Sequence, residues 1–467
     1  MVRRLMIVVC LAAQLALANA APAAQGATTA SELLDRMAAA LGGRERLARV
    51  ENVQTRFTLA AATVTITELR TNVPLDAAAF ARPAETTVAA RFARGSSVVT
   101  VPFEMNENHI FIPVRVNGSG PLWFMFDTGA EATIVEAGRA KAIGLDLRGS
   151  VTARGNGEGT MQASVVRGVT LAVEGAEVPA QTVYTIPLGD IEVFEGRRID
   201  GIIGYDFTSR FVVEIDYAAH HIHLHDPKTY VYKGRGERLP MKFFGKLPHV
   251  EATIDVAGHG PVSGRFLVDT GSRLSISLNA PFVQAHAWAR DLAEKAVAAP
   301  YGIGIGGESK SRVGRLAAFR LGRYAVDRPV TGFTFDRGGM KAQADHAGAI
   351  GGEVLRRFTV VFDYARQAIY LEPNAAFAEP FEYDMLGALL RLDGSHFVVH
   401  RIVAGSAAEG VGLEPGDAIV AIDGRPASDV SLEGARRMFR REGGSHALTV
   451  RRGEATSEVR VRLKRIV

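Results

Sequence analysis

One short acidic phrase occurs twice in this sequence. Residues 124–130 read FMFDTGA and residues 266–272 read FLVDTGS, so that an apolar run delivers Asp127 and then Asp269 into a Thr-Gly turn. Two carboxylates a few ångströms apart cannot easily both ionise, because the first negative charge raises the pKa of the second group. Such a pair provides one acid and one base near neutral pH and can hold a water molecule between them. The chemistry that this arrangement favours is hydrolysis by an activated water.

A single Asp-Thr-Gly is weak evidence, since short glycine turns are common and usually only close a loop. In this sequence each phrase is followed, in the same order, by a glycine-rich stretch, an apolar-apolar-glycine element and an apolar segment that ends in Asp-Tyr. These features lie at 154–159, 202–204 and 211–217 in the first half, and at 301–307, 349–351 and 358–364 in the second. Their common order and nearly equal spacing indicate an internal duplication.

This set of motifs resembles a retropepsin-type aspartic protease in which both halves of the usual dimer are fused in one chain. The resemblance covers roughly residues 97 to 374. It implies a mainly β fold of two barrel-like lobes related by a pseudo-twofold axis. It also implies that Asp127 and Asp269 are the catalytic pair, and that no metal or organic cofactor is needed.

The resemblance assigns supporting roles to the turn residues. Thr128 and Thr270 would hydrogen-bond across the interface between the lobes. Gly129 and Gly271 would let backbone N–H groups approach the carboxylates closely, because glycine has no side chain.

Further support is expected from residues around the two turns. Ser272 would hydrogen-bond the outer oxygen of Asp269, a contact that Ala130 cannot give Asp127, so we expect the two carboxylates to be inequivalent. The apolar-glycine elements are expected to support the site from the core. Their residues are Ile203, Gly204, Ile350 and Gly351.

The glycine-rich stretches are predicted to be flaps over the site. Flap closure would exclude water and let backbone groups bind an extended substrate as an added strand. The sequence leaves open whether one flap or both close. The flap glycines are Gly155, Gly157, Gly159, Gly302, Gly304 and Gly306.

The character of the sequence changes after residue 375. Residues 404–408, 412–417 and 419–424 resemble a bacterial PDZ domain, an α+β fold. In such domains the backbone N–H groups of an apolar-Gly-apolar loop bind a peptide carboxylate, and the next strand accepts the peptide by β-augmentation. By position this loop contains Leu386, Gly387 and Ala388. The whole chain resembles the bacterial family of exported aspartyl proteases with a C-terminal PDZ module.

The amino terminus has the pattern of a secretory signal. A basic start is followed by the apolar residues 5–17 and by the small-x-small pattern of residues 18–20, which predicts a removable signal peptide and a periplasmic or secreted protein. The alternatives are a buried helix or a twin-arginine address at Arg3 and Arg4. The single cysteine, Cys10, lies in this segment, so we expect no disulfide in the mature chain.

The amino-acid composition limits the kinds of partner that the protein is expected to bind. With 54 basic and 50 acidic residues the net charge is only +4, which does not indicate nucleic-acid binding, and no second apolar stretch is long enough to span a membrane. The expected partners are a polypeptide substrate and, at the PDZ domain, peptide or protein C-termini. We expect a monomer.

At 467 residues the chain is too long for one ordinary core. A capping box at residues 29–32 predicts an N-terminal helix, and the alternation of residues 53–59 predicts a strand. A further helix is predicted at residues 279–299. The predicted domains are a signal peptide (1–20), an accessory segment of unknown role (21–96), protease lobe 1 (97–232), protease lobe 2 (233–375) and the PDZ domain (376–467).

A run of histidines at residues 220–225 suggests a metal site, since His221, His223 and His225 share one face of a strand. Their counterparts in the other half are Ala368, Tyr370 and Glu372. The duplicated scaffold therefore gives no reason for a metal there, and we predict a solvated edge strand instead.

The function predicted from the sequence is that of an exported aspartic endopeptidase. One alternative is a catalytically inactive protease-like scaffold that binds extended peptides. Another is a protease that processes only its own N-terminal segment. The presence of both aspartates favours catalysis.

Overall fold

The structure is a computed structural model that describes residues 53–60, 63–71, 89–298 and 303–467. Contacts within the chain divide it into two units, residues 1–87 and 88–467. In the first unit, β1 (Val53–Ala60) and β2 (Thr63–Thr71) form an antiparallel hairpin, which confirms the strand predicted at 53–59. The predicted signal peptide and the helix predicted from residues 29–32 lie outside the described residues.

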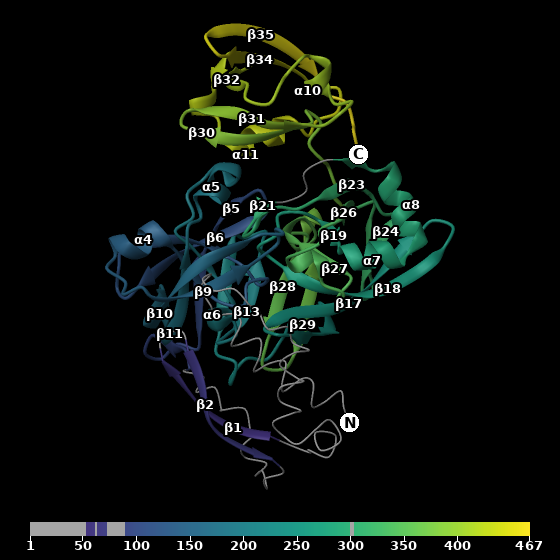
Figure 1. The fold of residues 1–467 in the computed structure, drawn as a ribbon. Helices are drawn as coiled ribbons and strands as arrows, with labels where there is room; N and C mark the ends of the chain where they lie inside the picture. Colours follow the sequence, from purple (N-terminus) through teal and green to yellow (C-terminus); the bar gives the residue numbers. More distant parts are fainter. Residues whose placement is uncertain (1–52, 61–62, 72–88, 299–302) are drawn as a thin grey trace, which may run out of the picture. The chain divides into compact units, whose positions relative to one another are not determined.

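The second unit is mainly β, as the sequence predicts (Figure 1). Strand formation follows from alternation: in β17 (Leu247–Val256), Val250, Ala252 and Ile254 are buried, whereas the residues between them are more exposed. The first lobe is one large sheet. Its strands are β3 (Arg91–Phe92), β5 (Glu104–Asn106), β6 (His109–Val116), β7 (Leu122–Phe126), β8 (Ile134–Glu136), β9 (Arg148–Arg154), β10 (Thr160–Val173), β11 (Ala176–Ile186) and β12 (Gly201–Ile203).

The second lobe repeats this plan with a sheet of its own. Its strands are β16 (Lys242–Phe244), β17 (Leu247–Val256), β18 (Gly260–Asp269), β19 (Ile276–Leu278), β20 (Val297–Ala298), β23 (Ser311–Arg315), β24 (Ala318–Leu321), β25 (Tyr324–Asp327), β26 (Val330–Thr334) and β27 (Gly348–Gly351). A small hairpin, β21 (Ile303–Gly304) with β22 (Gly307–Glu308), belongs to the same half. In each lobe the strand that ends at the Asp-Thr-Gly turn pairs in parallel with the apolar-glycine strand: β7 with β12, and β18 with β27.

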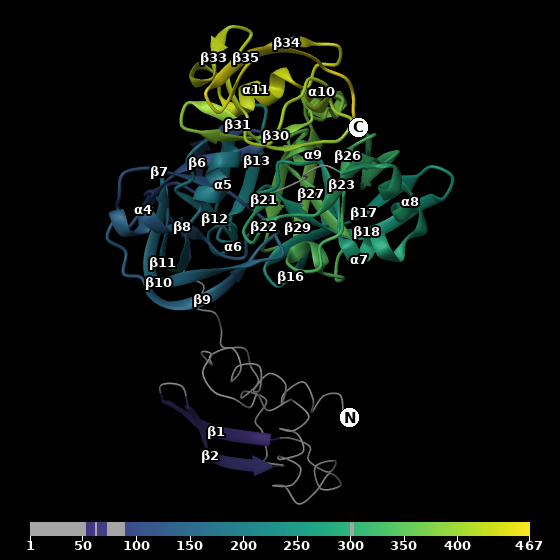
Figure 2. The ribbon, with the colours of Figure 1, turned by 45° about the horizontal axis from the view of Figure 1, so that its top comes forward.

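A six-stranded sheet joins the two halves. Figure 2 labels two of its strands, β13 and β29. Its strands are, in order, β15 (Glu237–Pro240), β29 (Ala368–Pro373), β28 (Phe358–Asp363), β13 (Val212–Asp216), β14 (His221–His225) and β4 (Val98–Pro102). The central pair, β13 and β28, is antiparallel and places Ile215 opposite Val360. These strands are the two duplicated segments that end in Asp-Tyr, so the pseudo-twofold axis that relates the halves passes between them.

Short helices complete the lobes. They are α4 (Ala137–Ala142), α5 (Gly189–Glu195), α6 (Tyr205–Thr208), α7 (Ala280–Ala285), α8 (Ala287–Lys295), α9 (Gly352–Leu355) and the 3-10 turns η2 (Met340–Ala342) and η3 (Ala375–Ala378). The helix predicted at 279–299 is thus two helices, because His286 adopts an extended backbone between them, and it ends before the short strand β20. Among the described residues, no helix has both the length and the apolarity needed to cross a membrane.

The C-terminal module has its own sheet and hydrophobic core. Its elements are β30 (Ala388–Asp393), β31 (His396–Ile402), α10 (Ala407–Gly410), β32 (Ala418–Ile422), β33 (Arg425–Pro426), η4 (Ala427–Asp429), α11 (Leu432–Met438), β34 (Ser445–Arg452) and β35 (Ala455–Arg462). Strand β30 follows the loop that contains Leu386, Gly387 and Ala388. It pairs only with β31 and therefore forms one edge of this sheet.

The histidines of β14 lie on one face of the strand, as their alternation predicts. The prediction of an edge strand is wrong, because β14 pairs with β13 on one side and with β4 on the other. The ring centroids of His221 and His223, and those of His223 and His225, are 6.2–6.3 Å apart. His223 contacts Thr100, and His225 contacts Glu214. Within the described part of the chain, no group of three or more His, Cys, Asp or Glu side chains is arranged to hold a metal ion.

Candidate active site

The strands β7 and β18 bring the two aspartates to the interface between the lobes. The N–H of Asp127 donates to the carbonyl of Ile203 at 3.0 Å, and Gly351 lies beside Asp269 in the parallel register of β18 and β27. Ile203 and Ile350 are fully buried. The predicted support residues therefore lie directly beneath the aspartates. Gly204 and Gly351 fit there because a Cβ on either would overlap backbone atoms of the adjoining loop.

The threonines of the two turns bind each other across the interface. The N–H of Thr128 donates to Oγ1 of Thr270, and the N–H of Thr270 donates to Oγ1 of Thr128, both at 3.0 Å. Each hydroxyl in turn donates to a carbonyl of the opposite lobe, that of Val268 or Phe126, at 2.7 Å. Both side chains are buried, so these four bonds fix the two turns relative to each other.

The two carboxyl groups hydrogen-bond to each other. Each also accepts the N–H of the glycine in its own turn: Asp127 from Gly129 at 2.7 Å and Asp269 from Gly271 at 3.0 Å. A Cβ on Gly129 would come within 2.5 Å of Asp269, and one on Gly271 within 2.2 Å of Asp127. Only glycine allows each turn to approach the opposite carboxyl this closely.

The pair is electrostatically asymmetric. Burial raises the pKa of Asp127, and the nearby Asp269 raises it further, so that this pKa lies well above its ordinary value. Burial also raises the pKa of Asp269, but the charge of Lys341, the hydrogen bond from Asp127 and the charge of His109 oppose that rise. The opposing charges near Asp269 thus favour the proton of the pair on Asp127.

Lys341 and His109 were not singled out from the sequence. Lys341 lies in η2, and its Nζ donates to Oγ of Ser277 at 2.7 Å. Burial lowers the pKa of Lys341, and Asp269 works against that shift. Since η2 lies in a segment between the recurring motifs, the duplication gave no reason to select this lysine.

His109 bridges the two halves. Its Nδ1 lies 2.9 Å from Oε1 of Glu195, and its Nε2 lies 3.1 Å from the carbonyl of Gly271. The ring thus links the last residue of α5 to the Asp-Thr-Gly loop of the second lobe. The duplication gave no signal for this residue: His249, opposite Leu267, corresponds in strand register to Phe111, opposite Met125.

Ser272 has a different neighbour from the one expected. Its Oγ lies against Gly351, and within the described residues no hydrogen bond joins this hydroxyl to the Asp269 carboxyl. The Ser272 N–H instead donates to the Asp269 carbonyl at 3.3 Å. The expected asymmetry of the aspartates is present, but its source is the pair of cations that face Asp269 rather than the hydroxyl of Ser272.

The glycine-rich stretches of the two halves meet each other. The N–H of Gly157 donates to the carbonyl of Ile305 at 3.0 Å, and that of Gly159 donates to Gly306 at 2.9 Å. The approach is so close that a Cβ on Gly157 would overlap Gly306. Gly155 and Gly304 lie at the same junction, whereas Gly302 is outside the described residues. Both predicted flaps thus take part in one closed contact.

A cleft of about 870 Å³ extends from the aspartates along both lobes. Its wall beside Asp127 includes Met125 and Ile202, and its wall beside Asp269 includes Leu267 and Met340. The cleft is therefore apolar on both sides of the carboxyl pair and polar at its centre, which suits an extended peptide with apolar side chains.

Comparison with known families agrees with this geometry. Residues 112–207 match the family described as aspartyl protease, and residues 384–451 match the PDZ domain. No curated protein matches the chain. The chain thus contains an aspartyl-protease-like domain and a PDZ domain, in agreement with the resemblance drawn from its motifs. The family match covers the first lobe, and the structure places the second Asp-Thr-Gly turn against it.

The reciprocal threonine bonds make a testable contribution to stability. Replacing Thr270 with Val removes the acceptor of the Thr128 N–H and leaves that buried donor unpaired. We expect the free energy of unfolding to fall by about 1–3 kcal/mol, measured by urea denaturation. The matched control is Thr253→Val, because the Thr253 hydroxyl is exposed and contacts only Ser263. A loss for Thr270→Val no larger than that of the control would contradict the structural role of these bonds.

Proposed function

We propose that this protein is an aspartic endopeptidase that hydrolyses peptide bonds with a water held between Asp127 and Asp269. The observation that carries the proposal is the buried pair of mutually hydrogen-bonded carboxyls at the floor of the cleft. In a purely structural role, two such groups would place two acidic side chains side by side in the interior, which is costly even with Lys341 nearby. A catalytic role explains why both lobes present the same residue.

The asymmetry of the pair assigns a role to each aspartate. Asp269, as the carboxylate, removes a proton from the water while Asp127 donates its proton to the carbonyl oxygen of the scissile bond. The new C–O bond gives a neutral tetrahedral diol, and the proton on Asp269 then passes to the amide nitrogen. The C–N bond breaks, Asp127 recovers a proton from the diol, and the products are a carboxylic acid and an amine.

The substrate class follows from the cleft. An extended peptide would lie across the aspartates with apolar side chains on either side of the bond that is cut. Backbone groups of the two flaps would hydrogen-bond it as an added strand. Export belongs to the same proposal, because the signal-like residues 1–20 would direct the enzyme to the periplasm or outside the cell.

The direct test is hydrolysis of a mixed peptide library across acid to neutral pH, with and without pepstatin. We expect cleavage that pepstatin abolishes and that falls at least about 100-fold in Asp127→Asn and in Asp269→Asn. Asp327→Asn is the control, because this carboxylate is exposed on β25. Full activity in either active-site variant would contradict the mechanism. Binding of intact peptides without cleavage would instead indicate a protease-like scaffold.

The role of Lys341 predicts a shift in the pH profile. The reaction requires Asp269 ionised and Asp127 protonated, so the acidic limb of the bell-shaped profile reports the ionisation of the pair. Removing the Lys341 charge raises the pKa of Asp269, because this cation opposes the effect of burial. In Lys341→Met we therefore expect the acidic limb of kcat/KM to move to higher pH.

The exposed lysine Lys242, replaced in the same way, is the control for that profile. An acidic limb that stays in place in Lys341→Met, or moves equally in Lys242→Met, would show that Lys341 does not stabilise the charged form of Asp269.

A further inference from the structure

Helix α5 of the first lobe lies against the PDZ domain at its peptide-binding position. It packs along β30, the edge strand that would accept a peptide by β-augmentation (Figure 1). The residue that ends this helix, Gly196, is so close to Leu432 of α11 that a Cβ on it would lie 2.5 Å from the Leu432 Cβ. Strand β30 and helix α11 are both walls of the groove, and α5 contacts both.

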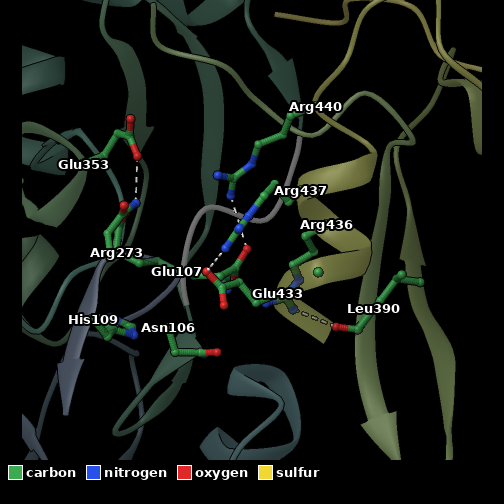
Figure 3. Close-up of polar contacts among 12 residues, drawn as sticks. Asn106, Glu107, His109, Arg273, Glu353, Leu390, Glu433, Arg436, Arg437 and Arg440 are labelled. Carbon is green, nitrogen blue, oxygen red and sulfur yellow. Dashed lines mark hydrogen bonds and ion pairs between the residues drawn. The ribbon is translucent and has the colours of Figure 1, made fainter. Parts of the chain in front are cut away.

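An internal carboxylate also binds the cations of this groove. Glu107 accepts from Nη1 of Arg436 at 2.5 Å and from Nη2 of Arg440 at 3.2 Å. Arg436 in addition donates to the carbonyl of Leu390 in β30 at 2.9 Å, so its side chain spans the groove (Figure 3). Glu107 and Arg436 are both buried.

The position of Glu107 is unusual for its residue type. It forms the two-residue turn between β5 and β6 with Asn108, and both have positive φ, 48° and 72°. Asparagine tolerates this left-handed backbone, whereas glutamate rarely adopts it. Burial alone would raise the pKa of Glu107, but Arg273, Arg436 and Arg440 outweigh it and hold the pKa below its ordinary value. The strained turn thus carries an ionised side chain directed at three arginines.

The loop that would bind a peptide carboxylate is enclosed as well. The N–H of Gly387 donates to Oδ1 of Asp384 at 2.8 Å. The space between this loop and Glu107 is a cavity of about 110 Å³, lined by Gly387, Ala388, Arg436 and Arg273. Such a volume holds a few water molecules but not several residues of a peptide. A peptide of several residues can therefore bind at this loop only if Glu107 moves away.

Two chains of contacts connect this docked groove to the aspartates. Glu107 also pairs with Arg273, four residues after Asp269, while Asn108 donates to the carbonyl of Arg273 at 2.8 Å. Glu195, the last residue of α5, binds His109, which contacts the carbonyl of Gly271. Both routes end on the Asp-Thr-Gly loop of the second lobe.

We propose that the PDZ domain is docked within its own chain, with helix α5 on its edge strand and Glu107 as the carboxylate that its arginines bind. A free C-terminal carboxylate of a peptide or protein is then a competitor of Glu107. Its binding separates the PDZ domain from α5 and loosens the loop from Gly271 to Arg273. This inference concerns binding and does not require hydrolysis.

The test compares peptide affinities in the full chain. Every protein carries Asp127→Asn so that the probe is not cut. The probe is a pool of fluorescent hexapeptides with four random C-terminal residues and a free carboxylate, and a second pool is C-terminally amidated. Glu107→Gln is compared with Glu104→Gln, an exposed glutamate on β5, the strand that leads into the turn of Glu107. We expect Glu107→Gln to bind the carboxylate pool at least about tenfold more tightly than the parent, and Glu104→Gln to bind like the parent.

A second pair of variants leaves every charge in place, in case the unpaired arginines of Glu107→Gln prevent folding. Gly196→Ala pushes α5 away from Leu432. Gly144→Ala is its control, because Gly144 follows helix α4 with the same backbone, φ 73° against 71°, and has nothing within 4 Å of an added Cβ. We expect Gly196→Ala to bind the carboxylate pool more tightly than Gly144→Ala and to show faster hydrogen exchange in residues 189–195.

Affinities within twofold of the parent in both Glu107→Gln and Gly196→Ala would overturn the docked arrangement. Tighter binding that is equal for the free and the amidated pools would overturn the competition with Glu107. Neither result would bear on hydrolysis, so a failure here is distinct from a failure of the proposed enzymatic function.

Discussion

A proton shared by two buried carboxyls is the interaction on which the rest of this structure depends. Asp127 and Asp269 each come from a strand end of a different lobe, and neither lobe alone would create the pair. Keeping two acids together in a buried place is unfavourable unless one of them remains protonated. The scaffold must therefore hold the turns in register against their mutual repulsion at high pH. The reciprocal bonds of Thr128 and Thr270 do this with backbone donors and buried hydroxyls.

The duplication makes the two lobes nearly symmetric, but the proposed reaction needs two aspartates with different pKa values. Most elements come in pairs: the Asp-Thr-Gly turns, the apolar-glycine strands, the flaps and the central strands of the joining sheet. The cations are not paired in this way, since Lys341 and His109 both act on Asp269. An acid and a base can therefore be distinguished in a site whose two carboxyls are presented by nearly identical turns.

Much of the site could be predicted because its signals are local in sequence. An Asp-Thr-Gly turn after an apolar strand fixes its own backbone, and repetition of the phrase identified Asp127, Asp269 and the threonines beside them. Lys341 and Glu107 could not be found in that way. Their roles depend on neighbours far away in the chain, such as Asp269 for Lys341 and Arg436 for Glu107, and a single charged residue carries no local signal of its partner. The PDZ loop was placed by its motif, but the contact of α5 with the neighbouring strand β30 depends on how two folded modules pack.

The ionisation state of the aspartate pair can be measured directly by following the side-chain carboxyl ¹³C resonances through a pH titration. The account predicts that at neutral pH one proton remains on the pair, and that Asp269→Asn lowers the pKa of Asp127 because a neighbouring negative charge is removed. Two fully ionised carboxylates at neutral pH, or an Asp127 titration unchanged by Asp269→Asn, would contradict the shared proton and the mechanism built on it.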